Sequence, residues 1–383
     1  MIEAGYNLQM TKRSEYEMDF SKEDSLKCKG FAILIMLFHH MYMSSDRYEE
    51  FTISFAPLTE LAVNQIADFC KLCVGIYVFI SAFGLTKSYS SWKNGVSSFI
   101  LQRTFKTMFL FYIIYIGAIL LSFVIAKEWN IYSAYGYGGE NETFPALWYM
   151  FIDFLGLADL FQTPTFNETW WYMSLAILLV FLIPALNKLY DKLNAVWMLS
   201  MAILLPEAMG LSQGNHVVRY LPLIILGIIC ARTRLLGICR ERLAKCKKVG
   251  KILCVGGFII FYIVCFTLRE GILKDDFIGI WDCSASFVSI CVLYFFINRI
   301  TFVSGILKFF GNYSTLIFLT HTFIRYYWFK DFVYGHISAW VNYIVLLVAA
   351  LFTAVVLDLL LKLLQIRRVE DYVRSKIMSL TQQ

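Results

Sequence analysis

The chain has 383 residues, of which 59% are hydrophobic, 17% aromatic and 16% charged, with a formal net charge of +6. A soluble globular domain has about 45–50% apolar and about 25% charged residues, so one soluble core cannot bury this apolar surplus and lipid must cover it. These values exclude a soluble enzyme, a secreted disulfide scaffold and a nucleic-acid-binding domain. The ten cysteines are scattered and imply no disulfide framework.

Ten apolar runs reach the length of about 20 residues that a helix needs to cross the hydrocarbon core. They cover residues 22–43, 69–87, 104–126, 170–188, 195–212, 217–237, 250–268, 277–298, 311–330 and 338–363. An eleventh run, residues 144–161, is shorter and is interrupted by Asp153, Gly156 and Asp159.

The distribution of Lys and Arg decides how the eleventh run is interpreted. Residues 231–251 hold eight Lys or Arg against one Glu, and residues 87–106 hold four basic residues and no acid. Both stretches should face the cytoplasm by the positive-inside rule, which requires that residues 144–161 do not span the bilayer. We therefore expect an all-α integral membrane protein with about ten transmembrane helices plus one short interfacial or re-entrant segment.

The loops then agree with this orientation. Residues 44–68 would lie outside, and they hold five Asp or Glu against the single Arg47. Both termini would lie inside, with residues 1–21 as a cytoplasmic N-terminal segment and residues 365–383 as a cytoplasmic C-terminal tail. No linker and no fixed-period repeat interrupts the chain, so we expect a single polytopic membrane domain over residues 1–383.

Polar residues inside an apolar span are candidates for function because they are costly to leave unpaired in hydrocarbon. The first span holds His39 and His40, and histidine exchanges protons near neutral pH. Lys29 precedes His40 by eleven residues, about three helical turns or roughly 16 Å, on a similar helix face. A snorkelling Lys and two histidines bonded into a helix interface would explain the same pattern.

Four further groups stand out. Arg103 and Lys106 are one turn apart at the cytoplasmic start of the third span, where they suit phosphates or serve as a positive-inside anchor. His321 in the ninth span is either a site residue or a structural hydrogen-bonding group. Trp170 and Trp171 begin the fourth span, where such rings form an interfacial belt or stack on sugars. Asp282 in the eighth span is a buried carboxylate without an obvious partner in the sequence.

Several segments together resemble the acyltransferase 3 family, integral-membrane acyltransferases that mostly modify extracytoplasmic glycans. The family's first span carries a basic residue, ten intervening positions and a His. The matching segments are Lys29-Gly-Phe-Ala-Ile with His39-His40, Val78-Phe-Ile-Ser81-Ala-Phe-Gly84, Arg103-x-x-Lys106, Trp171-Tyr-Met-Ser174 ahead of Pro184, and Tyr313-Ser314 with Leu319-Thr-His321. The sequence departs from the family at Lys29 and Lys106, where Arg is usual, and at Ala176, where many members have Glu.

The resemblance implies an O-acyltransferase that uses acyl-CoA, most simply acetyl-CoA, as a co-substrate, with no tightly bound cofactor and no metal. Lys29, Arg103 and Lys106 would hold the donor's phosphates. His40 would act as general base, supported by His39. Substrate-binding or supporting roles would fall to Ser81, Trp170, Trp171 and His321. The acceptor would be a hydroxyl of a cell-surface or lipid-linked glycan, and the location a bacterial cytoplasmic membrane.

A secondary transporter of a small polar solute is the main alternative, with His40, Asp282 and His321 as relay or binding groups. Against it, the sequence shows no paired halves with matching Gly- or Pro-broken spans. A membrane sensor without turnover is a third interpretation.

Overall fold

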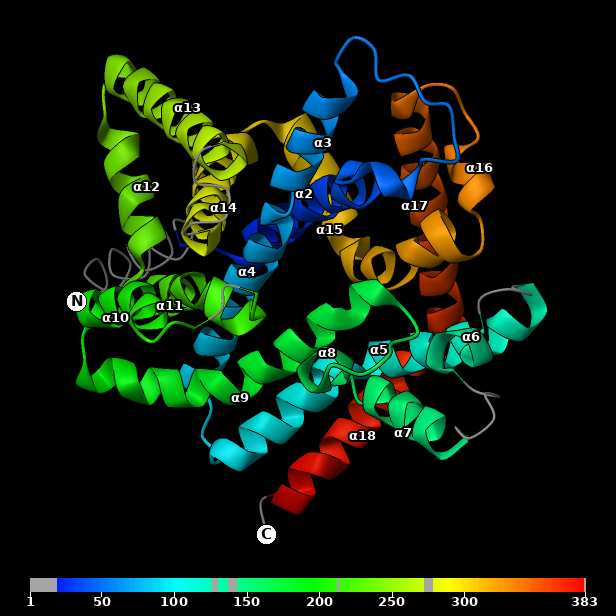
Figure 1. Ribbon diagram of the computed structural model, residues 1–383. Helices are drawn as coiled ribbons and strands as arrows, with labels where there is room; N and C mark the ends of the chain where they lie inside the picture. The colour runs from blue at the N-terminus through cyan, green and yellow to red at the C-terminus, as the bar shows by residue number, and fades with distance from the viewer. Residues whose placement is uncertain (1–18, 126–129, 137–142, 212–213, 272–277, 382–383) are drawn as a thin grey trace. The chain divides into compact units, whose positions relative to one another are not determined.

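The computed structural model describes residues 19–125, 130–136, 143–211, 214–271 and 278–381 (Figure 1). These residues are predominantly helical and include no strand. Eight of their helices are long and apolar enough to cross a membrane. The protein is thus an all-α multi-pass membrane protein. Of the expected N-terminal segment, residues 1–18 lie outside the described ranges.

Each of the ten expected spans corresponds to one helix. The helices are α2 (Lys22–Tyr42), α4 (Leu72–Ser90), α5 (Val96–Ile125), α9 (Trp171–Lys192), α10 (Ala195–Ala208), α11 (His216–Thr233), α13 (Lys248–Glu270), α14 (Ile278–Phe295), α15 (Thr301–Thr322) and α17 (Ala339–Leu363). Two of them are not among the eight helices that are long and apolar enough to cross a membrane: α2, whose first turns carry charges, and α10, which has 14 residues. A count of ten spans therefore stays a prediction.

Shorter elements connect these helices. They are α3 (Glu60–Phe69), α6 (Ile131–Tyr135), α7 (Thr143–Phe154), α8 (Ala158–Phe161), α12 (Leu235–Lys245), α16 (Lys330–Tyr334), α18 (Ile366–Thr381), the 3-10 turns η1 (Ser45–Arg47), η2 (Glu168–Trp170) and η3 (Ile297–Arg299), and the π-helical turn η4 (Phe323–Tyr327).

The run of residues 144–161 forms two short helices, α7 and α8. The chain breaks between them at Gly156, whose φ is +71°, a left-handed conformation that glycine adopts at little cost. The 12 residues of α7 extend about 18 Å, well short of the roughly 30 Å hydrocarbon core. This agrees with the expected short interfacial or re-entrant segment.

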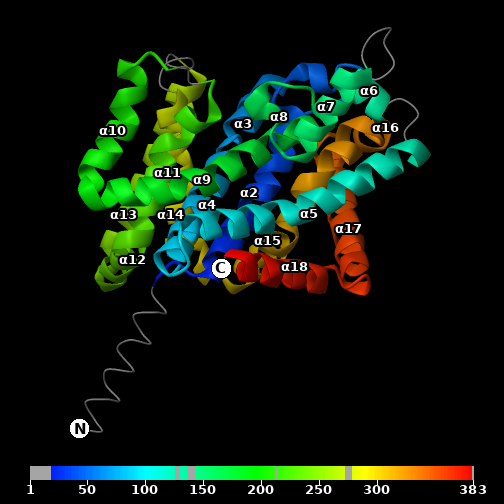
Figure 2. The same ribbon diagram turned by 90° about the horizontal axis from the view of Figure 1, so that it is seen from below.

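The C-terminal segment expected as a tail is helical over Ile366–Thr381. This helix, α18, lies against α5 (Figure 2). The Gln102 side-chain amide of α5 donates a hydrogen bond to the backbone oxygen of Arg374, with 2.9 Å between the two atoms. The segment is therefore packed along a span.

The chain divides into two compact units. The first contains residues up to Ala32, Lys71–Lys87 and Asn187–Asn312, and within it α13 packs beside α14 (Figure 1). The second contains Ile33–Cys70, Ser88–Leu186 and the residues from Tyr313 onward. A single membrane domain over the whole chain stays a prediction.

The buried carboxylate of Asp153 ties three segments of the second unit together. Its oxygens accept hydrogen bonds from the Tyr135 hydroxyl at 2.7 Å, the Thr165 hydroxyl at 2.9 Å and the Phe166 N–H at 2.7 Å. Burial raises the pKa of this carboxyl to about 6, and the three donors oppose the rise. The segment held here continues into Asn167, so Asp153 fixes the approach to η2 and α9.

Candidate functional site

Two glycines bring the helices of the candidate site together. A Cβ atom added to Gly30 of α2 would lie 1.8 Å from the Leu307 oxygen of α15, and one added to Gly311 of α15 would lie 2.0 Å from the Leu26 oxygen of α2. The two backbones are therefore in direct contact, an approach that only glycine permits.

His40 and His321 each lie ten residues beyond one of these glycines, about 15 Å of helical rise. Their ring centroids are 5.1 Å apart. His40 is partly exposed, whereas His321 is fully buried. The structure thus brings together a partly exposed histidine of the first expected span and a buried histidine of the ninth.

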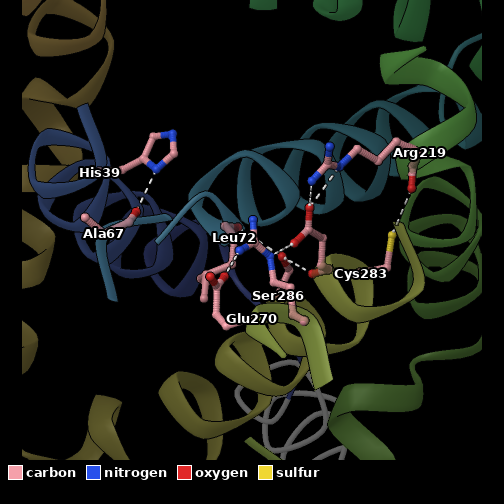
Figure 3. A network of polar contacts seen from close by, with 9 residues as sticks. His39, Ala67, Leu72, Arg219, Glu270, Cys283 and Ser286 are labelled. Carbon is pink, nitrogen blue, oxygen red and sulfur yellow. Dashed lines mark hydrogen bonds and ion pairs between the residues drawn. The ribbon is translucent and has the colours of Figure 1, made fainter. Parts of the chain in front are cut away.

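His39 supports this pair from the neighbouring position. Its Nδ1–H donates to the backbone oxygen of Ala67, with 2.7 Å between the heavy atoms (Figure 3). The His39 ring centroid lies 5.1 Å from that of His40. The buried ring is thus anchored to α3 beside His40, and the supporting role expected for His39 stays a prediction.

His321 is fixed in one tautomer by its own helix. Its Nδ1 lies 3.1 Å from the Ile317 oxygen and 2.9 Å from the Phe318 oxygen. Both oxygens only accept, so Nδ1 carries the proton and Nε2 of the neutral ring is an acceptor.

A chain of hydroxyl groups leads to this acceptor. The Thr322 hydroxyl lies 3.2 Å from Nε2 of His321 and donates to it, and the Thr169 hydroxyl lies 3.0 Å from that of Thr322. Asn167 holds Thr169 in place, because its Oδ1 accepts from the Thr169 N–H at 3.0 Å and caps η2. The arrangement connects a buried histidine to the start of α9.

Trp170 reinforces the same junction. Its Nε1–H donates to the Leu319 oxygen at 3.1 Å, and its ring packs edge-on against Phe323 with centroids 5.6 Å apart. Trp170 is therefore a buried packing residue of the site's wall. Trp171 is half-buried and contacts the Tyr172 ring.

Two arginines flank the histidines. Arg47 of η1 donates through Nη1 to the His40 backbone oxygen at 2.6 Å, and the same Nη1 is 3.4 Å from Nδ1 of His40. Burial and the charge of Arg325 lower the pKa of Arg47 to about 10, so it stays cationic at neutral pH. Arg325 lies in η4, one turn beyond His321, and both arginines act electrostatically on both histidines.

The four other expected donor or support residues lie elsewhere on the helices. Arg103 and Lys106 are on α5 in the second unit, where the Arg103 guanidinium donates to the Ser88 hydroxyl and lies over the Phe99 ring, 5.9 Å from its centroid. Lys106 is exposed. Lys29 on α2 and Ser81 on α4 belong to the first unit. Their roles in donor binding and support stay predictions.

Asp282 has partners that the sequence did not reveal. Its Oδ2 accepts from Nε of Arg219 at 2.9 Å, and its Oδ1 accepts from Nε of Arg269 at 2.7 Å (Figure 3). Arg269 also pairs with Glu270. Among the described residues, these buried ion pairs link α11, α13 and α14, which weakens the transporter interpretation that used Asp282 as a relay.

Sequence reasoning missed Arg47, Arg325 and the two threonines. Arg325 had a usable signal, because an arginine inside the expected span 311–330 and four residues after His321 is a functional candidate by position. Arg47 had none, since it follows the end of α2 and reaches His40 only through the turn η1.

Comparison with known proteins agrees with the geometry. A model of the acyltransferase 3 family, described as an acyltransferase domain, matches residues 28–359. The match runs through both compact units and includes the histidines, the glycine contact and η4. No curated relative and no solved structure matches the chain. The match over nearly the whole chain confirms the resemblance seen in the sequence: this protein belongs to the acyltransferase 3 family and is a membrane acyltransferase.

Proposed function

We propose that the protein moves an acyl group, most simply acetyl, from cytoplasmic acyl-CoA to a hydroxyl of an extracytoplasmic glycan, with His40 as general base. The observation that carries the proposal is the contact between partly exposed His40 and buried His321, whose ring centroids are 5.1 Å apart. In an acyltransferase, this pair supports a mechanism in which the His40 ring meets the substrate and the His321 ring holds the His40 ring in place.

The reaction needs one base and a bound thioester. His40 accepts the proton of the acceptor hydroxyl while the hydroxyl oxygen attacks the thioester carbonyl carbon. The carbon–sulfur bond then breaks, the ester forms, and the departing sulfur takes the proton back from His40. Acyl-CoA is a co-substrate here, and Lys29, Arg103 and Lys106 are the candidates for its phosphates.

The supporting groups act through position. His39 is anchored on Ala67 and His321 on its own helix, so both restrict the motion of the His40 ring. Holding a base in reacting geometry lowers the entropic part of the barrier. The acidic outer loop and the basic inner loops favour a cytoplasmic membrane in which donor and acceptor approach from opposite sides.

The experiment is CoA release by the purified protein from acetyl-CoA, with and without crude surface glycan. We expect glycan-stimulated release by the wild type and its loss in His40→Ala. The matched control is His336→Ala, because His336 is an exposed loop residue; this variant should keep wild-type turnover. Thermal unfolding of each variant reports whether it is folded.

Donor binding is tested separately. The double variant Arg103→Ala/Lys106→Ala should bind CoA more weakly than the wild type in a titration. Full turnover by a folded His40→Ala variant would refute the general-base mechanism, and unchanged CoA affinity in the double variant would remove these two residues from the donor site.

A further inference from the structure

Beside the histidine cluster lie two arginines that form no direct ion pair among the described residues and that the acyl-transfer mechanism leaves unexplained. Arg325 is 3% exposed, and among the described residues its Nε and Nη1 have no hydrogen-bond partner. Its guanidinium lies over the Tyr326 ring, 5.4 Å from the centroid. A buried arginine in a structural role normally forms several hydrogen bonds or an ion pair.

Arg47 adds a second positive charge beside it. The carboxylates that act on Arg47 are those of Asp46 and Glu168, and within the described chain neither forms an ion pair with it. Asp46 instead accepts from the Ser44 hydroxyl. Arg47 uses one N–H on the His40 backbone oxygen, a neutral acceptor that does not compensate its charge.

Two partly or fully buried cations without a carboxylate partner are unfavourable in the resting protein. A permanently anionic group would relieve this, because it would accept from the unpaired N–H groups and neutralise charge in one step. An oxyanion formed in the transition state would not relieve this cost, because it exists only briefly and the two arginines stay uncompensated in the resting protein. The chemistry therefore favours a ligand that is negatively charged in its ground state.

We infer that Arg325 and Arg47 form an anion-binding subsite beside His40, which takes a carboxylate or phosphate group of the molecule undergoing acyl transfer. The inference rests on the proposed function for its substrate class. The anion comes from one of two sources: an acidic sugar of the acceptor, or an acyl group that carries a second carboxylate.

The position of η4 explains how one continuous segment, α15 with η4, supplies both the His321 ring and the Arg325 charge. The turn begins directly after Thr322, and its wider π-helical winding carries Arg325 past the regular helical positions of α15. π-Helical turns of this kind are frequent at functional sites. His321 and Arg325 thus reach the same place from one continuous segment, the first as a base-positioning ring and the second as a charge.

A binding experiment tests the subsite without turnover. Thermal unfolding of the purified protein is measured at constant ionic strength with chloride, glucuronate, inorganic phosphate or neutral glucose. We expect glucuronate or phosphate to raise the Tm of the wild type, glucose to have no effect, and the shift to vanish in Arg325→Met. Arg368→Met is the matched control, because Arg368 is an exposed arginine of α18; it should respond like the wild type.

The same variant separates a binding role from a structural one. An uncompensated cation destabilises the resting protein, so Arg325→Met without added anion should be as stable as the wild type or more stable. A lower Tm in Arg325→Met combined with an unchanged response to anions would make Arg325 a structural residue and overturn the inference. Absence of any shift by glucuronate and phosphate in the wild type would also overturn it.

Kinetics then identify the source of the anion. With acetyl-CoA as donor, KM is compared for acidic and neutral acceptor glycans; with a neutral acceptor, it is compared for succinyl-CoA and acetyl-CoA. Loss of a charged hydrogen bond predicts that KM for the anionic partner alone rises about 10- to 100-fold in Arg325→Met. Equal KM values for anionic and neutral partners in the wild type would refute a substrate role. If no pair reacts while the Tm pattern holds, acyl transfer fails as the function and the anion subsite remains.

Discussion

At the scale of single residues, the direction of the hydrogen bonds around His321 determines what its ring can do. Two backbone oxygens hold the proton on Nδ1, so Nε2 needs a donor to remain buried without cost. Thr322 supplies that donor at 3.2 Å. The ring is thereby oriented toward His40 by groups that do not themselves change protonation state.

This arrangement predicts that Thr322→Val impairs catalysis more than folding. Valine keeps the shape of threonine but leaves Nε2 of His321 without its donor, which frees the ring to turn. We expect kcat to fall about 10-fold, corresponding to about 1.4 kcal/mol, with KM for acetyl-CoA unchanged. Thr315→Val, at an exposed position of the same helix, should leave kcat unaffected. Equal kcat values for the two variants would show that Thr322 does not orient the ring.

The sequence singled out the histidines as candidates because ionisable groups are rare inside apolar spans. It was insufficient for their neighbours. Arg47 meets His40 only because α2 ends at Tyr42 and η1 turns back, and Thr169 meets Thr322 only because α9 begins beside the end of α15. Such contacts depend on where helices stop, which composition and periodicity locate to within a few residues at best.

At the scale of elements, two glycines let the backbones of α2 and α15 touch within the first unit. Spans were predictable from apolar length, and every one of the ten expected runs became a helix. Which spans pack against each other was not predictable. Nothing in the sequence distinguishes Gly30 and Gly311 from other glycines, and their role is visible only in the contact between two backbones. The helix α18 in the C-terminal segment was not predicted for a related reason: it packs against α5, and such a tertiary contact leaves no pattern in the local sequence.

The close contact at Gly311 predicts that adding one methyl group there lowers the stability of the protein strongly. In Gly311→Ala, the new Cβ would lie 2.0 Å from the Leu26 backbone oxygen, so α2 and α15 must separate. We expect a lower Tm, because the first unit loses this close contact. Gly305→Ala on the same helix has no atom within 4 Å of its new Cβ, and the gain in helix propensity of up to about 1 kcal/mol should leave it as stable as the wild type. Equal loss of Tm in both variants would contradict the close approach.

At the scale of the whole molecule, the charge asymmetry between the loops predicts the orientation of the protein in the membrane. The eight Lys or Arg of residues 231–251 follow α11 and lead through α12 into α13, while the acidic residues 44–68 lie between α2 and α4. Basic loops resist translocation, so we expect the two stretches to lie on opposite sides of the membrane. If all ten expected helices cross, the spans between the two stretches place them on opposite sides only when α7 and α8 do not cross.

Two native cysteines make this orientation measurable. Cys239 and Cys246 are exposed and lie within the basic stretch, so a membrane-impermeant maleimide should label them in inverted membrane vesicles and leave them unlabelled in intact cells. The variant Cys239→Ser/Cys246→Ser should lose the vesicle signal, which assigns it to these thiols. On that background, Ser45→Cys in the acidic loop should be labelled in intact cells. Labelling of Cys239 and Cys246 from outside, with Ser45→Cys protected, would invert the topology and place the histidine cluster at the cytoplasmic end of α2, where a glycan acceptor could not reach it.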